Sequence, residues 1–146
     1  MAGIYIHIPF CKQRCRYCAF YSSTLYNIRE AYVDALCKEL LMRKEYIAGE
    51  PVDTIYLGGG TPSTLTMEQL KRICDTIYNN YPVTDAPEIT IECNPDDLTP
   101  EFLEQLKGLP FNRISMGIQS FNDTQLKRLG RRHTAEAARQ AVANTR

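Results

Sequence analysis

Four short apolar runs, rich in isoleucine and other β-branched or aromatic residues, predict β-strands at residues 4–8, 52–57, 88–92 and 113–118. Each run is followed by a stretch in which apolar residues recur three or four positions apart, which is the spacing of an amphipathic helix. A strand followed by a helix, four times over, is typical of a parallel sheet with helices packed on it, because parallel neighbours need a crossover of helical length. The sequence therefore predicts an α/β fold.

The helical stretches carry recognisable start signals. Residues 28–47 are predicted to form one long helix, with an apolar stripe along it. Thr66 and Gln69 have the form of a capping box at the start of a second helix. Thr99 is a cap and is followed by a proline that opens a third helix. Two shorter helical patterns lie at residues 122–129 and 134–144.

The C-terminal end of the pattern suggests that more protein follows. The alanine-rich helical pattern stops at Arg146 without a glycine, a proline or another cap. Four βα units cannot close a barrel, and they leave a parallel strand exposed at the edge of the sheet. We therefore expect this chain to be the N-terminal portion of a longer protein.

Composition and charge exclude some classes of function. The chain of 146 residues is long enough for one domain with a hydrophobic core, and its 17 basic and 17 acidic residues give no net charge to attract nucleic acid. No apolar run approaches the roughly 20 residues that span a bilayer. The N-terminus has neither a basic region nor an apolar region of the kind that marks a signal peptide, so we expect a cytoplasmic protein with reduced thiols.

Three cysteines, Cys11, Cys15 and Cys18, lie within eight residues directly after the first strand. A loop of this length can aim three thiolates at one point. Three cysteines suit an iron–sulfur cluster with one iron left open for chemistry, because a structural metal site closes its shell with a fourth protein ligand. A Cys₃His zinc site that includes His7 is the alternative. The other three cysteines are expected in the core, although the third of them, at a strand end, could line a site: Cys37, Cys74 and Cys93.

The other unusual segments also follow strands. They are residues 58–63 after the second strand, 92–96 after the third and 117–121 after the fourth. In parallel α/β sheets, function gathers at the carboxyl ends of the strands. We therefore expect these segments and the cysteine loop to share one rim, and this coincidence favours a cluster over zinc.

The residues on this rim have different physical roles. Three consecutive glycines at 58–60 allow close backbone approach to a ligand that carries a carboxylate and an ammonium group. Glu92 can accept hydrogen bonds from an amine or a ribose hydroxyl, or be a solvated carboxylate. Gln119 offers a donor and an acceptor for a sugar, or is an ordinary loop residue. Arg131 could hold a carboxylate through two hydrogen bonds, or form an exposed basic pair with Arg132.

Together these segments resemble a known family. The spacing Cys-x₃-Cys-x₂-Cys between a strand and a helix resembles the signature of the radical S-adenosylmethionine (SAM) superfamily. The wider pattern is similar to the branch that holds the oxygen-independent coproporphyrinogen III oxidases and the related heme chaperones of the HemW subgroup. That pattern comprises residues 5–11, 58–63, 92–95, 114–121 and 129–133.

One position separates the two subgroups of this branch. The oxidases have a further cysteine two residues after the third cysteine of the motif, whereas this chain has Phe20 there. The resemblance is therefore closer to the heme chaperones and implies a heme-binding, heme-trafficking protein. The alternative is a radical enzyme that decarboxylates coproporphyrinogen III, and whether the chain is an enzyme is left open.

The resemblance also implies a fold and ligands. It implies a partial, TIM-like (β/α)₆ barrel, with residues 1–146 as its first four units and the rest of the barrel and a C-terminal domain outside this chain. It implies a [4Fe–4S] cluster on the three cysteines, with SAM on the open iron, and a low-potential electron donor such as flavodoxin or ferredoxin. Heme or a porphyrinogen is implied as the ligand of the full-length protein. The residues implied around SAM are Tyr5, Tyr17, Gly59, Gly60, Thr61, Glu92, Gln119 and Arg131.

Overall fold

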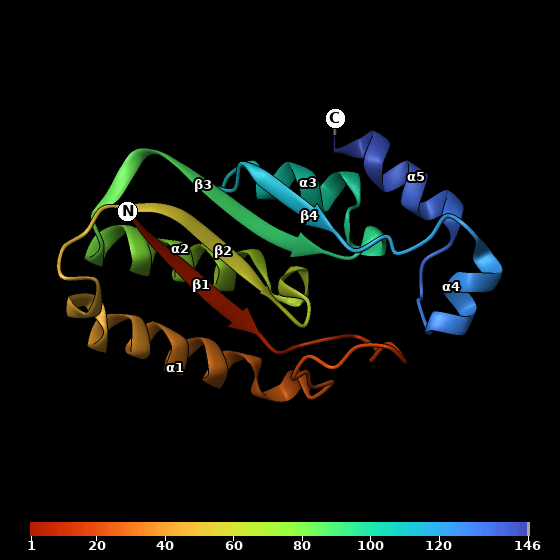
Figure 1. Cartoon of the computed structure of the whole chain (residues 1–146), viewed down its shortest axis with the longest axis horizontal. Helices are drawn as coiled ribbons and strands as arrows, with labels where there is room; N and C mark the ends of the chain where they lie inside the picture. Colours follow the sequence, from red (N-terminus) through yellow and green to blue (C-terminus); the bar gives the residue numbers. More distant parts are fainter. Residues whose placement is uncertain (146) are drawn as a thin grey trace.

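A computed structural model describes residues 1–145 of the chain. It contains a four-stranded sheet in which all neighbours are parallel and the strand order follows the sequence (Figure 1). The predicted α/β fold is confirmed. The strands are β1 (Ala2–Ile8), β2 (Val52–Gly59), β3 (Val83–Cys93) and β4 (Arg113–Met116).

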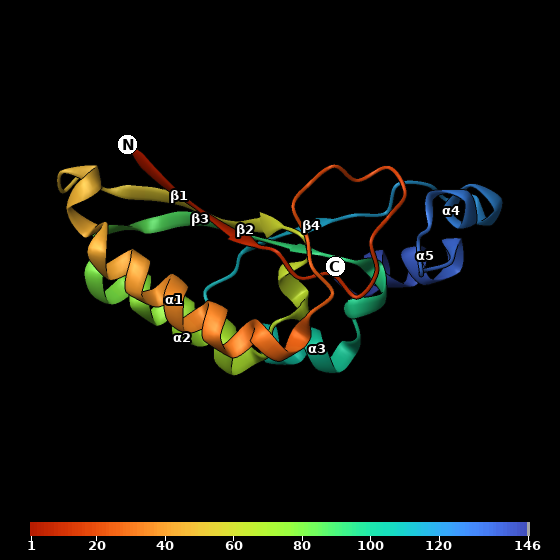
Figure 2. The same ribbon diagram turned by 90° about the horizontal axis from the view of Figure 1, so that it is seen from below.

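A helix or a pair of helices follows each strand, as the alternating pattern predicts. Helices α1, α2 and α3 all lie on one face of the sheet, whereas α4 and α5 lie beyond the carboxyl end of β4 (Figure 2). The five helices are α1 (Arg29–Met42), α2 (Met67–Asn80), α3 (Pro100–Leu106), α4 (Asp123–Leu129) and α5 (Ala135–Asn144).

The hydrophobic core lies between the sheet and α1 to α3. Alternate strand residues such as Ile6, Ile8 and Ile91 are at most 2% exposed and belong to one apolar cluster with the inward side of α2. The intervening residues lie on the opposite face, where Tyr5 is 59% exposed. Among residues 1–145 no helix lies on that face, and the cysteine loop crosses it near the carboxyl ends of the strands (Figure 2).

The helix starts agree with the sequence, but one helix is shorter than predicted. Thr66 and Gln69 form the capping box in full, and the Thr99 hydroxyl accepts from the third helix. The helix predicted at 28–47 ends at Met42, because Arg43 leaves the helical region with φ −99° and ψ 7°. A separate 3₁₀ turn, Lys44–Ile47, follows it.

The strand boundaries also differ from the prediction. The fourth strand ends at Met116 and not at residue 118, because Gln119 has a positive φ of 68° and turns the chain away from the sheet. The Gly117 amide still donates to the Cys93 carbonyl at 3.0 Å. The third strand, Val83–Cys93, begins five residues before the predicted start at 88.

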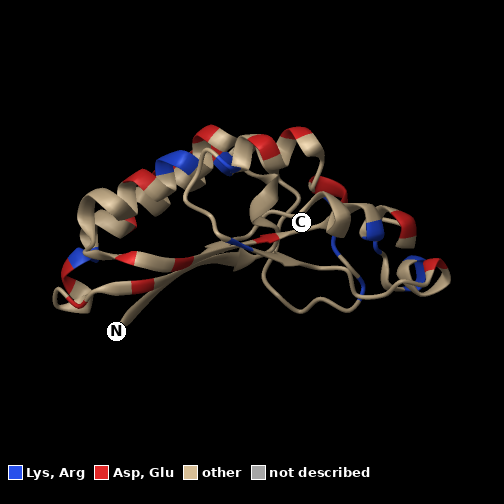
Figure 3. Ribbon diagram, turned by 90° about the horizontal axis from the view of Figure 1, so that it is seen from above, with Lys and Arg blue, Asp and Glu red and all other residues tan. Residues whose placement is uncertain are grey.

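Acidic and basic residues are interleaved along the outer helices (Figure 3). Some form exposed pairs one helical turn apart, such as Lys71 with Asp75 on α2. Within residues 1–145, no helix is both long enough and apolar enough to cross a membrane.

Candidate functional site

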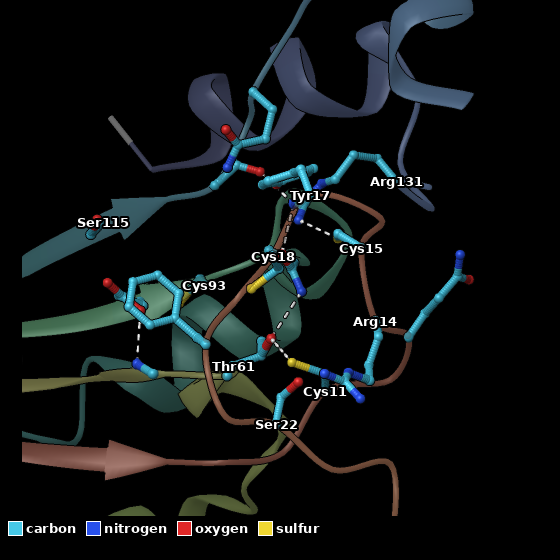
Figure 4. A pocket seen from close by; sticks show the side chains of 18 of the residues that line it. Cys11, Arg14, Cys15, Tyr17, Cys18, Ser22, Thr61, Cys93, Ser115 and Arg131 are labelled. Carbon is cyan, nitrogen blue, oxygen red and sulfur yellow. Dashed lines mark hydrogen bonds between the residues drawn. The ribbon is translucent and has the colours of Figure 1, made fainter. Parts of the chain in front are cut away.

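A cavity of about 550 Å³ lies at the carboxyl ends of the strands (Figure 4). The cysteine loop forms one wall, and the segments that follow β2, β3 and β4 form the others. The predicted convergence on one rim is therefore confirmed. The sequence-predicted residues that line the cavity are Cys11, Cys15, Tyr17, Cys18, Gly59, Gly60, Thr61, Glu92, Gln119 and Arg131.

All three loop cysteines are free thiols at the cavity wall, and the sulfurs of Cys11 and Cys15 contact different partners. The Cys11 sulfur lies 3.5 Å from the Thr61 hydroxyl, and Arg131 Nη1 donates to the Cys15 sulfur at 3.4 Å. Within residues 1–145, no group of three or more His, Cys, Asp or Glu side chains is close enough to hold a metal. Ligation by all three thiolates would therefore need a small rearrangement of the loop, which is common where ligands converge on binding.

A buried ion pair fastens the cysteine loop to the protein. The Lys12 ammonium pairs with one oxygen of Asp97, whose side chain is only 3% exposed. The other oxygen accepts from the Ser63 hydroxyl at 2.7 Å. Asp97 thus joins the loops that follow β1, β2 and β3. The sequence analysis missed this contact, because nothing in the spacing relates residue 12 to residue 97.

Hydrogen bonds in the middle and at the far end of the loop hold it as well. The Arg16 amide donates to the carbonyl of Leu129, the last residue of α4, at 3.1 Å. The His7 ring lies 3.0 Å from the Tyr21 carbonyl through Nε2 and 3.1 Å from the Tyr5 hydroxyl through Nδ1. Both ring nitrogens of His7 are therefore engaged elsewhere, which speaks against the Cys₃His alternative. His7 instead anchors the far end of the cysteine loop.

The glycine run is shaped by its protein neighbours. Gly59 has a φ of +108°, and a Cβ there would come within 2.5 Å of the His7 ring. A Cβ on Gly60 would come within 2.9 Å of the backbone after β1. Their amides are also taken, since Gly59 donates to Glu92 at 3.1 Å and Gly60 to the Ile8 carbonyl at 2.9 Å. In this structure both amides are therefore occupied by protein acceptors.

Glu92 is tied into the strand ends and is not free in solvent. One oxygen accepts from the Tyr56 hydroxyl at 2.7 Å and the other from the Gly59 amide at 3.1 Å. Burial raises the pKa of Tyr56, and so does its hydrogen bond to the Glu92 carboxylate. A carboxylate has about four acceptor positions. Glu92, which lines the cavity, therefore keeps acceptor capacity for a ligand.

The two predicted tyrosines differ in their positions. Tyr17 lies on the cysteine loop at the cavity wall, and burial raises its pKa, as does the neighbouring Cys15, although Arg131 opposes the rise. Tyr5 is not part of the cavity wall. It stacks on Tyr56 with ring centroids 6.1 Å apart, on the open face of the sheet.

Arg131 is the most connected side chain of the site. Its Nη1 contacts the Cys15 sulfur, and its Nη2 donates to Asn94 Oδ1 at 2.7 Å and to the Gly117 carbonyl. Its Nε is buried without a partner. Arg131 is thus a partly buried residue held by the site and does not form an exposed basic pair with Arg132, which pairs with Asp96.

The remaining cysteines are placed much as expected. Cys74 and Cys93 are buried, and burial raises the pKa of each thiol to about 12. Cys93 belongs to the core and also lines the floor of the cavity. Cys37 is only partly buried but packs against the hydrophobic core, so it is less buried than a core position would be.

Comparison with known proteins agrees with this geometry. The model of the Radical SAM superfamily matches residues 5–146. The heme chaperone HemW of Bacillus subtilis is 40% identical over 135 residues, which are 91% of this chain and 36% of that protein. HemW of Escherichia coli is 39% identical over 142 residues, 96% of this chain and 38% of that protein.

A solved structure shows the same fold. Coproporphyrinogen III oxidase (HemN) from Escherichia coli, described as a radical SAM enzyme, superposes with a TM-score of 0.88 at 31% identity. The match covers 97% of this chain and 33% of HemN. The chain thus spans 33–38% of the length of these relatives. From the match over nearly its whole length, the chain belongs to the radical SAM superfamily.

Proposed function

We propose that Cys11, Cys15 and Cys18 hold a [4Fe–4S] cluster and that the cavity beside them binds SAM, in a protein that handles heme. The observation that carries the proposal is that three free thiols from one short loop line the same cavity as the loops after β2, β3 and β4. Three cysteines leave one iron of such a cluster open to a further ligand.

The residues present fit both groups. Each loop cysteine is unpaired and reaches the cavity wall, which suits a cluster ligand. The Arg131 Nε is a buried donor without a protein partner, and a ligand carboxylate would satisfy it. Glu92 and Gln119 also line the cavity and offer acceptors for an amine or ribose hydroxyls. Tyr17 would cover the ligand. The methionine end of SAM would contact Gly59, Gly60 and Thr61. Tyr5 would contribute from the open face of the sheet, outside the cavity wall.

A reduced cluster of this kind supplies one electron to cleave the SAM sulfonium, and the protein's task is to bind, orient and exclude water. In this chain, Arg131 would orient the carboxylate while it remains fixed by Asn94 and Gly117. Phe20 is 67% exposed on the same loop and borders the cavity. It places an apolar ring where the oxidases, by resemblance, have a further cysteine.

We infer a HemW-type, heme-trafficking role in a reducing, cytoplasmic compartment, with the chain as the first four units of a (β/α)₆ radical SAM core. A low-potential donor such as flavodoxin or ferredoxin would supply the electron. The similarity to HemW supports this role, and so does Phe20. The likeness to HemN keeps porphyrinogen decarboxylation as the second candidate.

A paired assay on the polypeptide that contains this chain separates the two functions. Heme binding is measured by absorbance titration, and conversion of coproporphyrinogen III is measured by product chromatography under anaerobic, reducing conditions with SAM. We expect saturable heme binding and no turnover. Robust turnover without heme binding would overturn the chaperone role and establish the oxidase. A Phe20→Cys variant tests whether the residue in this slot decides the outcome.

A further inference from the structure

A chain of hydrogen bonds joins two of the cluster cysteines through three different loops (Figure 4). From Cys15 it runs to Arg131 Nη1 at 3.4 Å, and from Arg131 Nη2 to Asn94 Oδ1 at 2.7 Å. Asn94 Nδ2 then lies 3.3 Å from the Thr61 hydroxyl, which lies 3.5 Å from the Cys11 sulfur. Asn94 is the central member and contacts neither sulfur directly.

Chemistry fixes the direction of the hydrogen bonds at Asn94. Arg131 can only donate, so the Asn94 oxygen accepts and its NH₂ group is directed at Thr61. A Cys11 thiolate that holds a cluster has no proton, so towards it the Thr61 hydroxyl is the donor. Both ends of this series of hydrogen bonds therefore donate to a sulfur, and the donor to Cys15 is the guanidinium cation of Arg131. Such an arrangement suits sulfurs that carry negative charge.

We propose that Asn94 is a positioning residue that orients Arg131 and Thr61 as hydrogen-bond donors to the sulfurs of Cys15 and Cys11, and thereby raises the reduction potential of the cluster. Hydrogen bonds to cluster sulfurs are among the factors that set such potentials, because they stabilise the more negative, reduced state. The proposal rests on the proposed cluster, and it adds a residue that the sequence analysis did not single out.

The experiment is an EPR-monitored redox titration of the anaerobically reconstituted protein with Asn94→Ala and Asn94→Leu. Both substitutions remove the two contacts without adding a charge, and leucine keeps most of the side-chain volume. In both variants we expect a more negative potential. The reduced-to-oxidised ratio at fixed potential should fall threefold to tenfold, which is about 30–60 mV for a one-electron couple. Asn94→Leu carries the test if Asn94→Ala does not fold.

Asn112 provides the matched control. Its side chain also makes two hydrogen bonds, to the Ile89 amide and the Pro87 carbonyl at 2.8 Å each, but it lies outside the cavity wall. Asn112→Ala should lower stability and leave the potential unchanged. If wild type forms a cluster and both Asn94 variants keep its potential, the positioning role is refuted. If wild type forms no cluster, the proposed function itself fails, so the two failures are distinct.

Discussion

Replacing Lys12 with methionine tests the anchoring of the cysteine loop. The change removes the counter-charge of Asp97, whose side chain is 3% exposed, while keeping much of the length and packing of the lysine stem. Removing one partner of a buried pair costs about 3–5 kcal/mol. Because the Lys12 side chain is 40% exposed and Ser63 still donates to Asp97, we expect a loss below that range, about 2–3 kcal/mol of the free energy of unfolding.

Urea unfolding of the metal-free protein, followed by far-UV circular dichroism, measures this loss. Lys71→Met is the control, because its pair with Asp75 is more than half exposed on both sides and should cost about 0.5 kcal/mol or less. The double variant Lys12→Met/Asp97→Asn should regain part of the loss, since no buried charge is left unpaired. If Lys12→Met and Lys71→Met lower the free energy of unfolding by amounts that agree within about 0.5 kcal/mol, the Lys12–Asp97 pair does not hold the loop as argued.

Three further predictions concern the same region. Gly59→Ala should lower the free energy of urea unfolding by about 1–3 kcal/mol, and by more than Gly49→Ala does. Both glycines have a positive φ, but only at Gly59 would the new Cβ meet the His7 ring. Equal losses in the two variants would contradict this. Cys74 and Cys93, with pKa values of about 12, should resist alkylation at pH 8 in the native protein, as read by peptide mass spectrometry, while the loop cysteines react. Burial and the nearby Arg131 lower the pKa of His133, so its neutral ring stabilises the fold above the ordinary histidine pKa near 6.5. That contribution is lost as the pH falls below this value. In a pH series of unfolding measurements, the free energy of unfolding should therefore fall less in His133→Gln than in wild type.

The periodic parts of the fold were the most predictable from the sequence. The alternation of Ile6 and Ile8 with exposed residues identified β1, and the Thr66 capping box identified the start of α2, because both depend on near neighbours. The end of α1 at Met42 was missed, since the helical spacing continues into a 3₁₀ turn whose backbone differs only slightly.

The location of the site was predictable from the sequence, but the side-chain contacts within it were not. Strand ends that are far apart in sequence meet because the sheet is parallel, so the rim followed from the order of elements. Which side chains pair on that rim depends on three-dimensional distances, so the contacts of Asn94, Asp97 and His7 were not predicted. A polar residue directly after a strand end, as Asn94 is, was the one signal that could have identified it.

The most direct test of the account is anaerobic reconstitution with iron and sulfide, followed by iron analysis and EPR. We predict about four iron atoms per wild-type chain and a cluster signal on reduction. Both should be lost in Cys11→Ala, Cys15→Ala and Cys18→Ala, and both should be kept in Cys74→Ala, which changes only a buried thiol in α2. Stoichiometric zinc binding with no cluster, or a cluster that survives loss of a loop cysteine, would contradict the central claim.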